Sequence, residues 1–150
     1  MKIIIVAVGK EKDFAGHELV AEYTERIGHY VQTEWTYIPA STMKEEGDRI
    51  LKTLDTHQSG CHVVLLDEQG KERTSVQFAE FIQSRLNEGL KSLLFLIGGA
   101  HGFDTRVAER AQSKMALSQL TFPHQLVRLI LAEQIYRACT IMKGEQYHHQ

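Results

Sequence analysis

The sequence contains little cysteine and little proline, and each shortage excludes a class of protein. Its 150 residues include two cysteines, Cys61 and Cys139, which cannot build a disulfide framework or a four-ligand zinc site on their own. Both cysteines lie in apolar stretches, which favours buried free thiols. The two prolines and the scattered glycines form no linker. The length and this uniformity predict a single domain over residues 1–150.

Long apolar runs are also missing. The longest, residues 3–8 and 93–97, are far shorter than the roughly 20 residues that a membrane-spanning helix needs. The first residues do not show the basic, apolar and cleavage segments of a secretory signal. We therefore expect a cytoplasmic protein that has no membrane partner.

Neither sign of charge dominates the chain. The formal net charge is −2, which disfavours strong nonspecific attraction to nucleic acid. Residues 1–60 carry 7 basic and 10 acidic side chains, whereas residues 61–150 carry 10 and 9. If RNA is the partner, we expect its contacts in the second part of the chain or across a subunit boundary.

What the sequence does contain is a regular alternation of β-rich runs and helical stretches. Strands are predicted over residues 2–9, 33–38, 61–66, 93–97 and 115–120, and the third is expected to stop at residues 67–70. Helices are predicted over residues 14–30, 45–58, 75–88, 105–112 and 123–142, where the ends at 88 and 142 are approximate. The third is expected to be capped by Thr74 or Ser75, and the fourth by Asp104. This alternation predicts an α/β fold with a mostly parallel sheet flanked by helices.

Three segments follow predicted strands and are candidates for a binding site. They are residues 65–70, 97–102 and 117–124, and ligands of open α/β sheets bind beyond the carboxyl ends of the strands. The middle segment contains Gly98, Gly99 and Gly102, which either let a ligand approach the backbone closely or simply make a tight turn. Phosphate-binding glycine motifs, a hydrolase nucleophile elbow and metal-ligand clusters are absent from the sequence.

The last predicted helix is apolar around nearly its whole circumference. Such a helix must be buried on all sides, either by its own domain or by a second subunit. In a chain of this size a subunit interface is the more economical explanation. Arg128 lies near the amino end of the helix, and it is either an interface arginine with a buried stem or a functional residue.

Four stretches together resemble one family. They are Leu-Ile-Gly-Gly-x-x-Gly at residues 96–102, Thr-Phe-Pro-His-Gln-Leu-Val-Arg at 121–128, Glu-Gln-x-Tyr-Arg-Ala at 133–138, and the pair Tyr147 and His148. The chain resembles the small SPOUT-class methyltransferases that modify N3 of a pseudouridine in 23S ribosomal RNA, and the resemblance covers essentially its full length. It implies a SPOUT-type fold with a C-terminal trefoil knot, and a homodimer.

The resemblance also implies a cofactor and its contacts. S-adenosyl-L-methionine is expected to bind in the knot, and by matching position its contacts are Leu66, Gly98, Leu117, Ser118, Gln119, Leu120, Thr121 and Phe122. The function so implied is methylation of 23S rRNA in the large subunit or the assembled ribosome. The alternatives are a catalytically inactive ribosome-associated factor with the same fold, and a flavodoxin-like domain.

The expected catalytic residues are His124, Arg128, Tyr147 and His148. N3 of pseudouridine carries an imide proton, and either His124 or His148 can accept it. Arg128 is expected to stabilise negative charge on the base or to bind a phosphate. The final helix is about 30 Å long at 1.5 Å per residue. Because the helix separates the tail from His124 and Arg128 of the same subunit, we predict that the tail supplies Tyr147 and His148 to the partner subunit's site. The expected reaction requires no metal.

Overall fold

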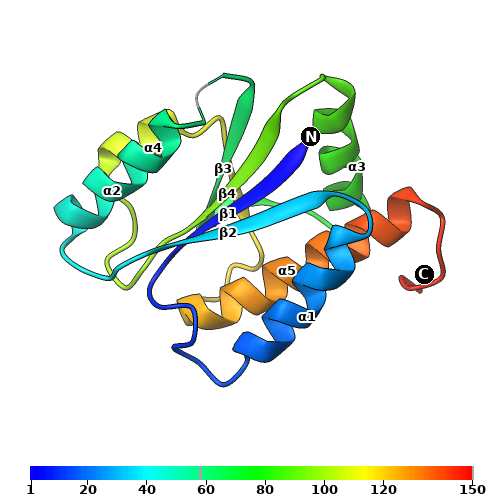
Figure 1. Cartoon of the computed structure of the whole chain (residues 1–150), viewed down its shortest axis with the longest axis horizontal. Coiled ribbons are helices and arrows are strands. Elements are labelled where there is room, and N and C mark those ends of the chain that lie inside the picture. Colours follow the sequence, from blue (N-terminus) through cyan, green and yellow to red (C-terminus); the bar gives the residue numbers. More distant parts are fainter. Residues whose placement is uncertain (58, 150) are drawn as a thin grey trace.

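Five parallel strands form the centre of the molecule (Figure 1). The computed structural model describes residues 1–57 and 59–149. In chain order the strands are β1 (Lys2–Val8), β2 (Gln32–Ile38), β3 (Cys61–Glu72), β4 (Ser92–Ile97) and β5 (Ser113–Ala116). Their order in the sheet is β2-β1-β4-β3-β5. The predicted parallel α/β sheet is confirmed.

Helices cover both faces of this sheet (Figure 1). One face packs against α2 (Met43–Asp55) and α4 (Thr105–Arg110), and the other against α1 (His17–Gly28), α3 (Ser75–Asn87) and α5 (His124–Met142). Side chains alternate across a strand. In β1, Ile3 and Ile5 therefore join one apolar cluster, whereas Ile4 and Val6 join the other. The need to fill two cores explains why the first strand is apolar throughout.

Two predicted helix caps are confirmed. Thr74 accepts a hydrogen bond from the backbone of Gln77, whose side chain bonds back to Thr74, so α3 begins with a capping box. Asp104 caps α4 through the backbone N–H of Arg106. The helix α4 is shorter than predicted. It ends before Gln112, which donates its N–H to Val63 and accepts from the Val63 N–H through its side chain.

The prediction for the end of the third strand was wrong. β3 does not stop at residues 67–70 but continues to Glu72, with a shift in its pairing to β5 between Leu66 and Lys71. Asp67 accepts a hydrogen bond from the N–H of Gln69, which forms a local turn, and the chain then pairs with β5 again. β5 was likewise predicted over the wrong residues, because it ends at Ala116. Residues 117–120 are therefore a loop.

The remaining predictions concern the helix ends and the cysteines. α2 begins at Met43 behind a cap at Thr42, two residues earlier than predicted, and its predicted end at residue 58 lies outside the described residues. Cys139 is buried, and burial raises the pKa of its thiol to about 11, whereas Cys61 is only partly buried. No helix in residues 1–57 and 59–149 has the length and hydropathy to cross a membrane.

Candidate cofactor and substrate site

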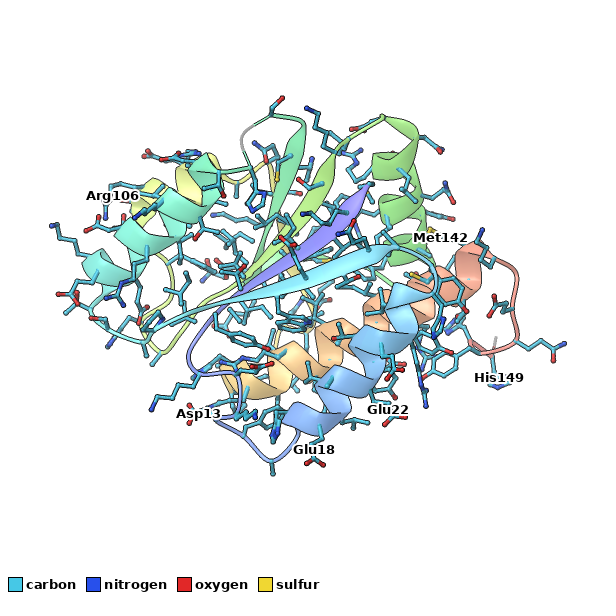
Figure 2. All side chains as sticks on the ribbon, in the orientation of Figure 1. Asp13, Glu18, Glu22, Arg106, Met142 and His149 are labelled. Atoms are coloured by element: carbon cyan, nitrogen blue, oxygen red, sulfur yellow. The ribbon has the colours of Figure 1, made fainter. Side chains whose placement is uncertain are left out.

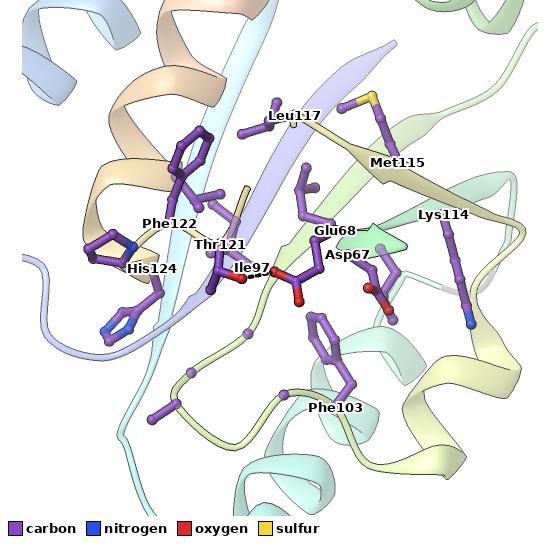
Figure 3. Close-up of a pocket in the computed structure, with 18 of the residues that line it drawn as sticks. Asp67, Glu68, Ile97, Phe103, Lys114, Met115, Leu117, Thr121, Phe122 and His124 are labelled. Carbon is purple, nitrogen blue, oxygen red and sulfur yellow. Dashed lines mark hydrogen bonds between the residues drawn. The ribbon is translucent and has the colours of Figure 1, made fainter. Parts of the chain in front are cut away.

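A pocket of about 680 Å³ lies at the carboxyl ends of β3, β4 and β5 (Figure 3). All three segments that the sequence marked after strands contribute to its walls. The lining includes Leu66, Asp67 and Glu68 from β3, Gly98, Gly99, Gly102 and Phe103 after β4, and Leu117, Ser118, Leu120, Thr121, Phe122 and His124 after β5. Thr105 and Ala108 of α4 complete it. The topology of the sheet therefore brings residues as distant in the chain as Leu66 and Thr121 to one pocket.

The glycines after β4 are required by the packing of the pocket wall. A Cβ on Gly98 would lie 3.2 Å from the ring of Phe103, and one on Gly99 would lie 2.9 Å from Val8 Cγ1. Gly102 has a φ of +72° and donates its N–H to the carbonyl of Gly99. The segment is thus a tight turn, and it is also a wall of the pocket.

A side-chain hydrogen bond connects two walls of the pocket. Thr121 Oγ1 donates a hydrogen bond to Glu68 Oε2 at 2.5 Å, which joins the β3 wall to the loop after β5 (Figure 3). The neighbouring loop is fixed by Ser118, whose hydroxyl accepts from the N–H of Leu120. The Leu120 side chain stays 70% exposed at the pocket wall. An exposed leucine there is an apolar surface that a ligand or a second subunit can cover.

His124 lies in the pocket wall, and Arg128 lies one helical turn behind it. Burial lowers the pKa of His124, and the positive charge of Arg128 lowers it further. Arg128 is 1% exposed; its Nη1 donates to the carbonyl of Lys10 at 2.8 Å and its Nη2 to that of Val8 at 3.0 Å. The guanidinium also lies against the ring of Tyr37, 5.2 Å from its centroid. Arg128 therefore links the segment after β1 to α5, beside a histidine whose pKa it lowers.

Comparison with known proteins identifies the family of the chain. A family model described as "Predicted SPOUT methyltransferase" matches residues 1–148. The chain belongs to the SPOUT methyltransferase family. Two relatives named "Ribosomal RNA large subunit methyltransferase H" are each 43% identical to it. That of Cytophaga hutchinsonii aligns with 99% of this chain and 100% of its own length, and that of Christiangramia forsetii with 100% of both.

Solved structures share the SPOUT fold at much lower identity. A probable methylase family protein from Haemophilus influenzae Rd KW20 superposes with a TM-score of 0.58 at 7% identity, over 99% of this chain and 70% of its own. TrmJ from Z. mobilis ZM4 gives a TM-score of 0.50 at 14% identity, over 90% and 67% of the two chains. These similarities support the fold alone.

The structure of this SPOUT methyltransferase gathers most of the residues that the sequence marked for the cofactor. Gln119 is the exception, because it belongs to the same loop but is not among the described residues that line the pocket. Sequence reasoning missed Glu68 and Phe103 as individual residues, although both lie in or next to segments it had singled out. Their position in the pocket wall depends on the pairing of β3 with β4, which the sequence does not show.

The tail of this SPOUT methyltransferase lies along its own final helix. Tyr147 donates its hydroxyl to Glu133 Oε1 at 3.0 Å, and His148 Nδ1 lies 3.1 Å from Arg137 Nη1. His149 projects beyond the end of α5 (Figure 2). None of these tail residues is among the described residues that line the pocket. Within one subunit, Tyr147 and His148 are therefore not brought to His124.

Proposed function

We propose that the chain transfers a methyl group from S-adenosyl-L-methionine to N3 of a pseudouridine in the 23S rRNA of the large ribosomal subunit. The observation that supports this most is the meeting of three post-strand segments at one pocket, in a chain of the SPOUT methyltransferase family. The printed names of its full-length relatives support a large-subunit rRNA as the substrate. A ribosomal substrate agrees with the expected cytoplasmic location.

The residues present fit the methyl donor. A volume of about 680 Å³ is within the usual range for a small-molecule site, and apolar walls with a few polar groups are typical of one. We infer that Leu66, Gly98 and the loop 117–122 hold the donor, which supplies an electrophilic methyl group when bound. The chain contributes orientation and the exclusion of water, which are the main requirements of an in-line displacement.

The proton on N3 requires an acceptor, and we propose that His124 is that base. Its lowered pKa keeps the imidazole neutral at neutral pH, so a ring nitrogen can take the proton. Of the two histidines that the sequence left open, His124 lines the pocket, whereas His148 of the same subunit contacts Arg137. We no longer propose Arg128 as a direct ligand, because the residue is 1% exposed and each of its two terminal nitrogens donates to a backbone carbonyl.

A homodimer with a knotted C-terminal region remains part of this proposal. The exposed side chains Leu120 and Leu126, 70% and 42% exposed, give α5 and its leading loop an apolar surface for a second subunit. We still propose that Tyr147 and His148 act in trans. The test mixes His124→Ala with a chain truncated after Gly144 and allows the subunits to exchange. Partial recovery of methylation supports donation in trans, and no recovery after verified exchange contradicts it.

The central experiment measures cofactor binding and methylation separately. Calorimetry should show binding of S-adenosyl-L-methionine to the wild type and none to folded Gly98→Val, because the new side chain displaces Phe103 in the pocket wall. Large ribosomal subunits incubated with enzyme and donor should gain one methyl group on a pseudouridine, mapped by mass spectrometry of the digested 23S rRNA. Binding to ribosomes without methyl transfer would favour the inactive ribosome-associated factor.

A further inference from the structure

A second group of basic side chains lies outside the pocket, around the ring of Phe81 on α3. The guanidinium carbon of Arg73 lies 4.5 Å from the ring centroid and that of Arg85 lies 5.2 Å from it. The imidazole of His62 meets the same ring edge-on at 5.8 Å, and its Nδ1 lies 3.4 Å from Arg85 Nη1. Three basic groups from β3, the segment after it and α3 thus share one aromatic platform. We call them the β3–α3 basic cluster.

Little in the protein compensates the charge of the β3–α3 basic cluster. Glu88 pairs with Arg85 at 2.7 Å, but Arg73 forms no hydrogen bond or ion pair with any residue in the described part of the chain. Arg73 Nη1 and Arg85 Nε are buried and have no acceptor there. Burial, and then the charge of Arg85, lowers the pKa of Arg73. Burial and the two arginines also lower that of His62, against a smaller opposing effect of Glu88.

Two donors of the cluster, Arg73 Nη1 and Arg85 Nε, have no acceptor in the described chain. A buried N–H without an acceptor is unfavourable, and stacking on Phe81 supplies no acceptor. An anion in contact with both guanidinium groups would supply acceptors and neutralise the charge at once. Arginine is the residue type best suited to hold phosphate in this way.

The β3–α3 basic cluster is separated from the pocket by a single strand. Ser113 Oγ lies 2.7 Å from His62 Nε2, and the next residue of β5, Lys114, lines the pocket. Consecutive side chains of a strand point to opposite faces of the sheet. A polynucleotide with one base at the pocket can therefore pass around the edge strand β5 and place a neighbouring phosphate at the cluster.

We propose that His62, Arg73 and Arg85 form a phosphate-binding site for the backbone of the RNA substrate, beyond the edge strand β5. The site rests on the proposed function, since it needs an RNA at the pocket. Its ligand is a phosphodiester group recognised by shape and charge. The site would position the RNA and carry no sequence information.

The test compares the binding of large ribosomal subunits as a function of salt. The double variant Arg73→Gln/Arg85→Gln should bind about tenfold more weakly at low salt, and its log–log salt slope should be smaller by about 1. The matched control is Arg110→Gln, which removes an exposed arginine paired with Asp55 on the other face of the sheet. The control should match the wild type. An unchanged affinity and slope in the double variant would overturn the inference.

Two further measurements separate this inference from the proposed function. The affinity of the double variant for S-adenosyl-L-methionine should equal that of the wild type, because no member of the β3–α3 basic cluster lines the described pocket. If the wild type binds neither the donor nor the subunits, the proposed function fails. If the double variant does not fold, Arg73→Gln alone serves, because Arg73 has no hydrogen bond to lose. A wild-type slope in that variant would equally contradict the phosphate site.

Discussion

Two regions of this molecule bury arginine in opposite ways. Behind the pocket, Arg128 satisfies the carbonyls of Val8 and Lys10 and leaves only its Nε without a described partner. Around Phe81, Arg73 stacks on an aromatic ring and has no hydrogen bond or ion pair in the described chain, whereas Arg85 stacks on the same ring and pairs with Glu88. Arg128 therefore stabilises the fold by linking α5 to the segment after β1. Arg73 and Arg85 each keep a nitrogen without an acceptor in the described chain, which is the property expected of a site for an external anion.

The comparison shows why residue type alone does not reveal an arginine's role. The motif that carries the resemblance made Arg128 the obvious candidate for contact with RNA, yet the structure uses its donors to fix the segment after β1. Arg73 and Arg85 belong to no stretch that the sequence singled out. Their proximity depends on the extension of β3 to Glu72, which delivers Arg73 to the side of α3.

The largest expected effect separates these two kinds of arginine by stability. Arg128→Met should lower the free energy of unfolding by about 3 kcal/mol, because the carbonyls of Val8 and Lys10 lose their donors and the bond to Val8 is buried. Arg73→Met, the matched change at the other region, should change it by less than about 1 kcal/mol in either direction, because the stacking on Phe81 is lost together with a buried N–H that has no acceptor in the described chain. Urea unfolding followed by circular dichroism measures both.

The difference between the losses of unfolding free energy in Arg128→Met and Arg73→Met is the decisive quantity. Equal losses of stability would mean that Arg73 has structural partners like those of Arg128, and the anion site would lose its main support. A variant more stable than the wild type at Arg73 would strengthen the argument that the free protein retains an unfavourable cluster of charge.

An intermediate effect is expected where the backbone meets Arg128. Gly9 has a φ of +113°, and a Cβ there would lie 2.6 Å from Arg128 Nη2. Gly9→Ala should therefore destabilise the protein by about 1–3 kcal/mol through backbone strain and displacement of the guanidinium. Gly28→Ala is the control, because nothing lies within 4 Å of its Cβ position at the end of α1. That variant should be neutral or stabilising by up to about 1 kcal/mol.

Thermal or urea unfolding of the two glycine variants tests this directly. A Gly9→Ala protein as stable as Gly28→Ala would show that the segment after β1 can move away from Arg128 without cost. The tie between that segment and α5 would then be weaker than its two hydrogen bonds indicate.

The sequence predicted the fold more fully than the site. Periodicity identified the five strands and five helices of the described residues, because each strand of a covered parallel sheet must fill an apolar core on both faces. It failed where polar residues continue a strand, as at residues 67–72 of β3. Asp67 and Gln69 form a local turn within a ladder that then resumes, and the sequence has the same polar pattern as a terminating loop.

The sequence predicted which segments form the candidate site, but it did not predict the contacts between their residues. The rule that ligands bind beyond strand ends located three walls of the pocket, and the resemblance supplied the residues within them. The hydrogen bond between Thr121 and Glu68 could not be anticipated, because it joins a loop to a strand residue 53 positions away in the chain. The place of the tail was also beyond sequence reasoning, since Tyr147 bonds to Glu133 through a reversal of the chain after α5.

The smallest expected effect is electrostatic and occurs in both regions. In each, an arginine lowers the pKa of a neighbouring histidine that burial has already lowered: Arg128 acts on His124, and Arg85 acts on His62. Removing the positive charge should raise the histidine pKa, because the imidazolium form no longer meets a like charge. NMR titration of the imidazole protons in Arg128→Met and Arg85→Gln measures this, and Arg110→Gln should leave both titrations unchanged.

The same shifts have a consequence for stability. A histidine whose pKa is lower in the folded than in the unfolded chain binds fewer protons when folded, so the free energy of unfolding falls as pH decreases below about 6.5. In Arg85→Gln this acid loss should be smaller than in the wild type, since the folded pKa of His62 moves back toward its unfolded value. Urea unfolding at pH 7.5 and 5.5 gives the difference. An acid loss that is unchanged or larger in Arg85→Gln would mean that burial alone sets the His62 pKa, and that Arg85 is too well screened to repel a neighbouring cation or attract a phosphate.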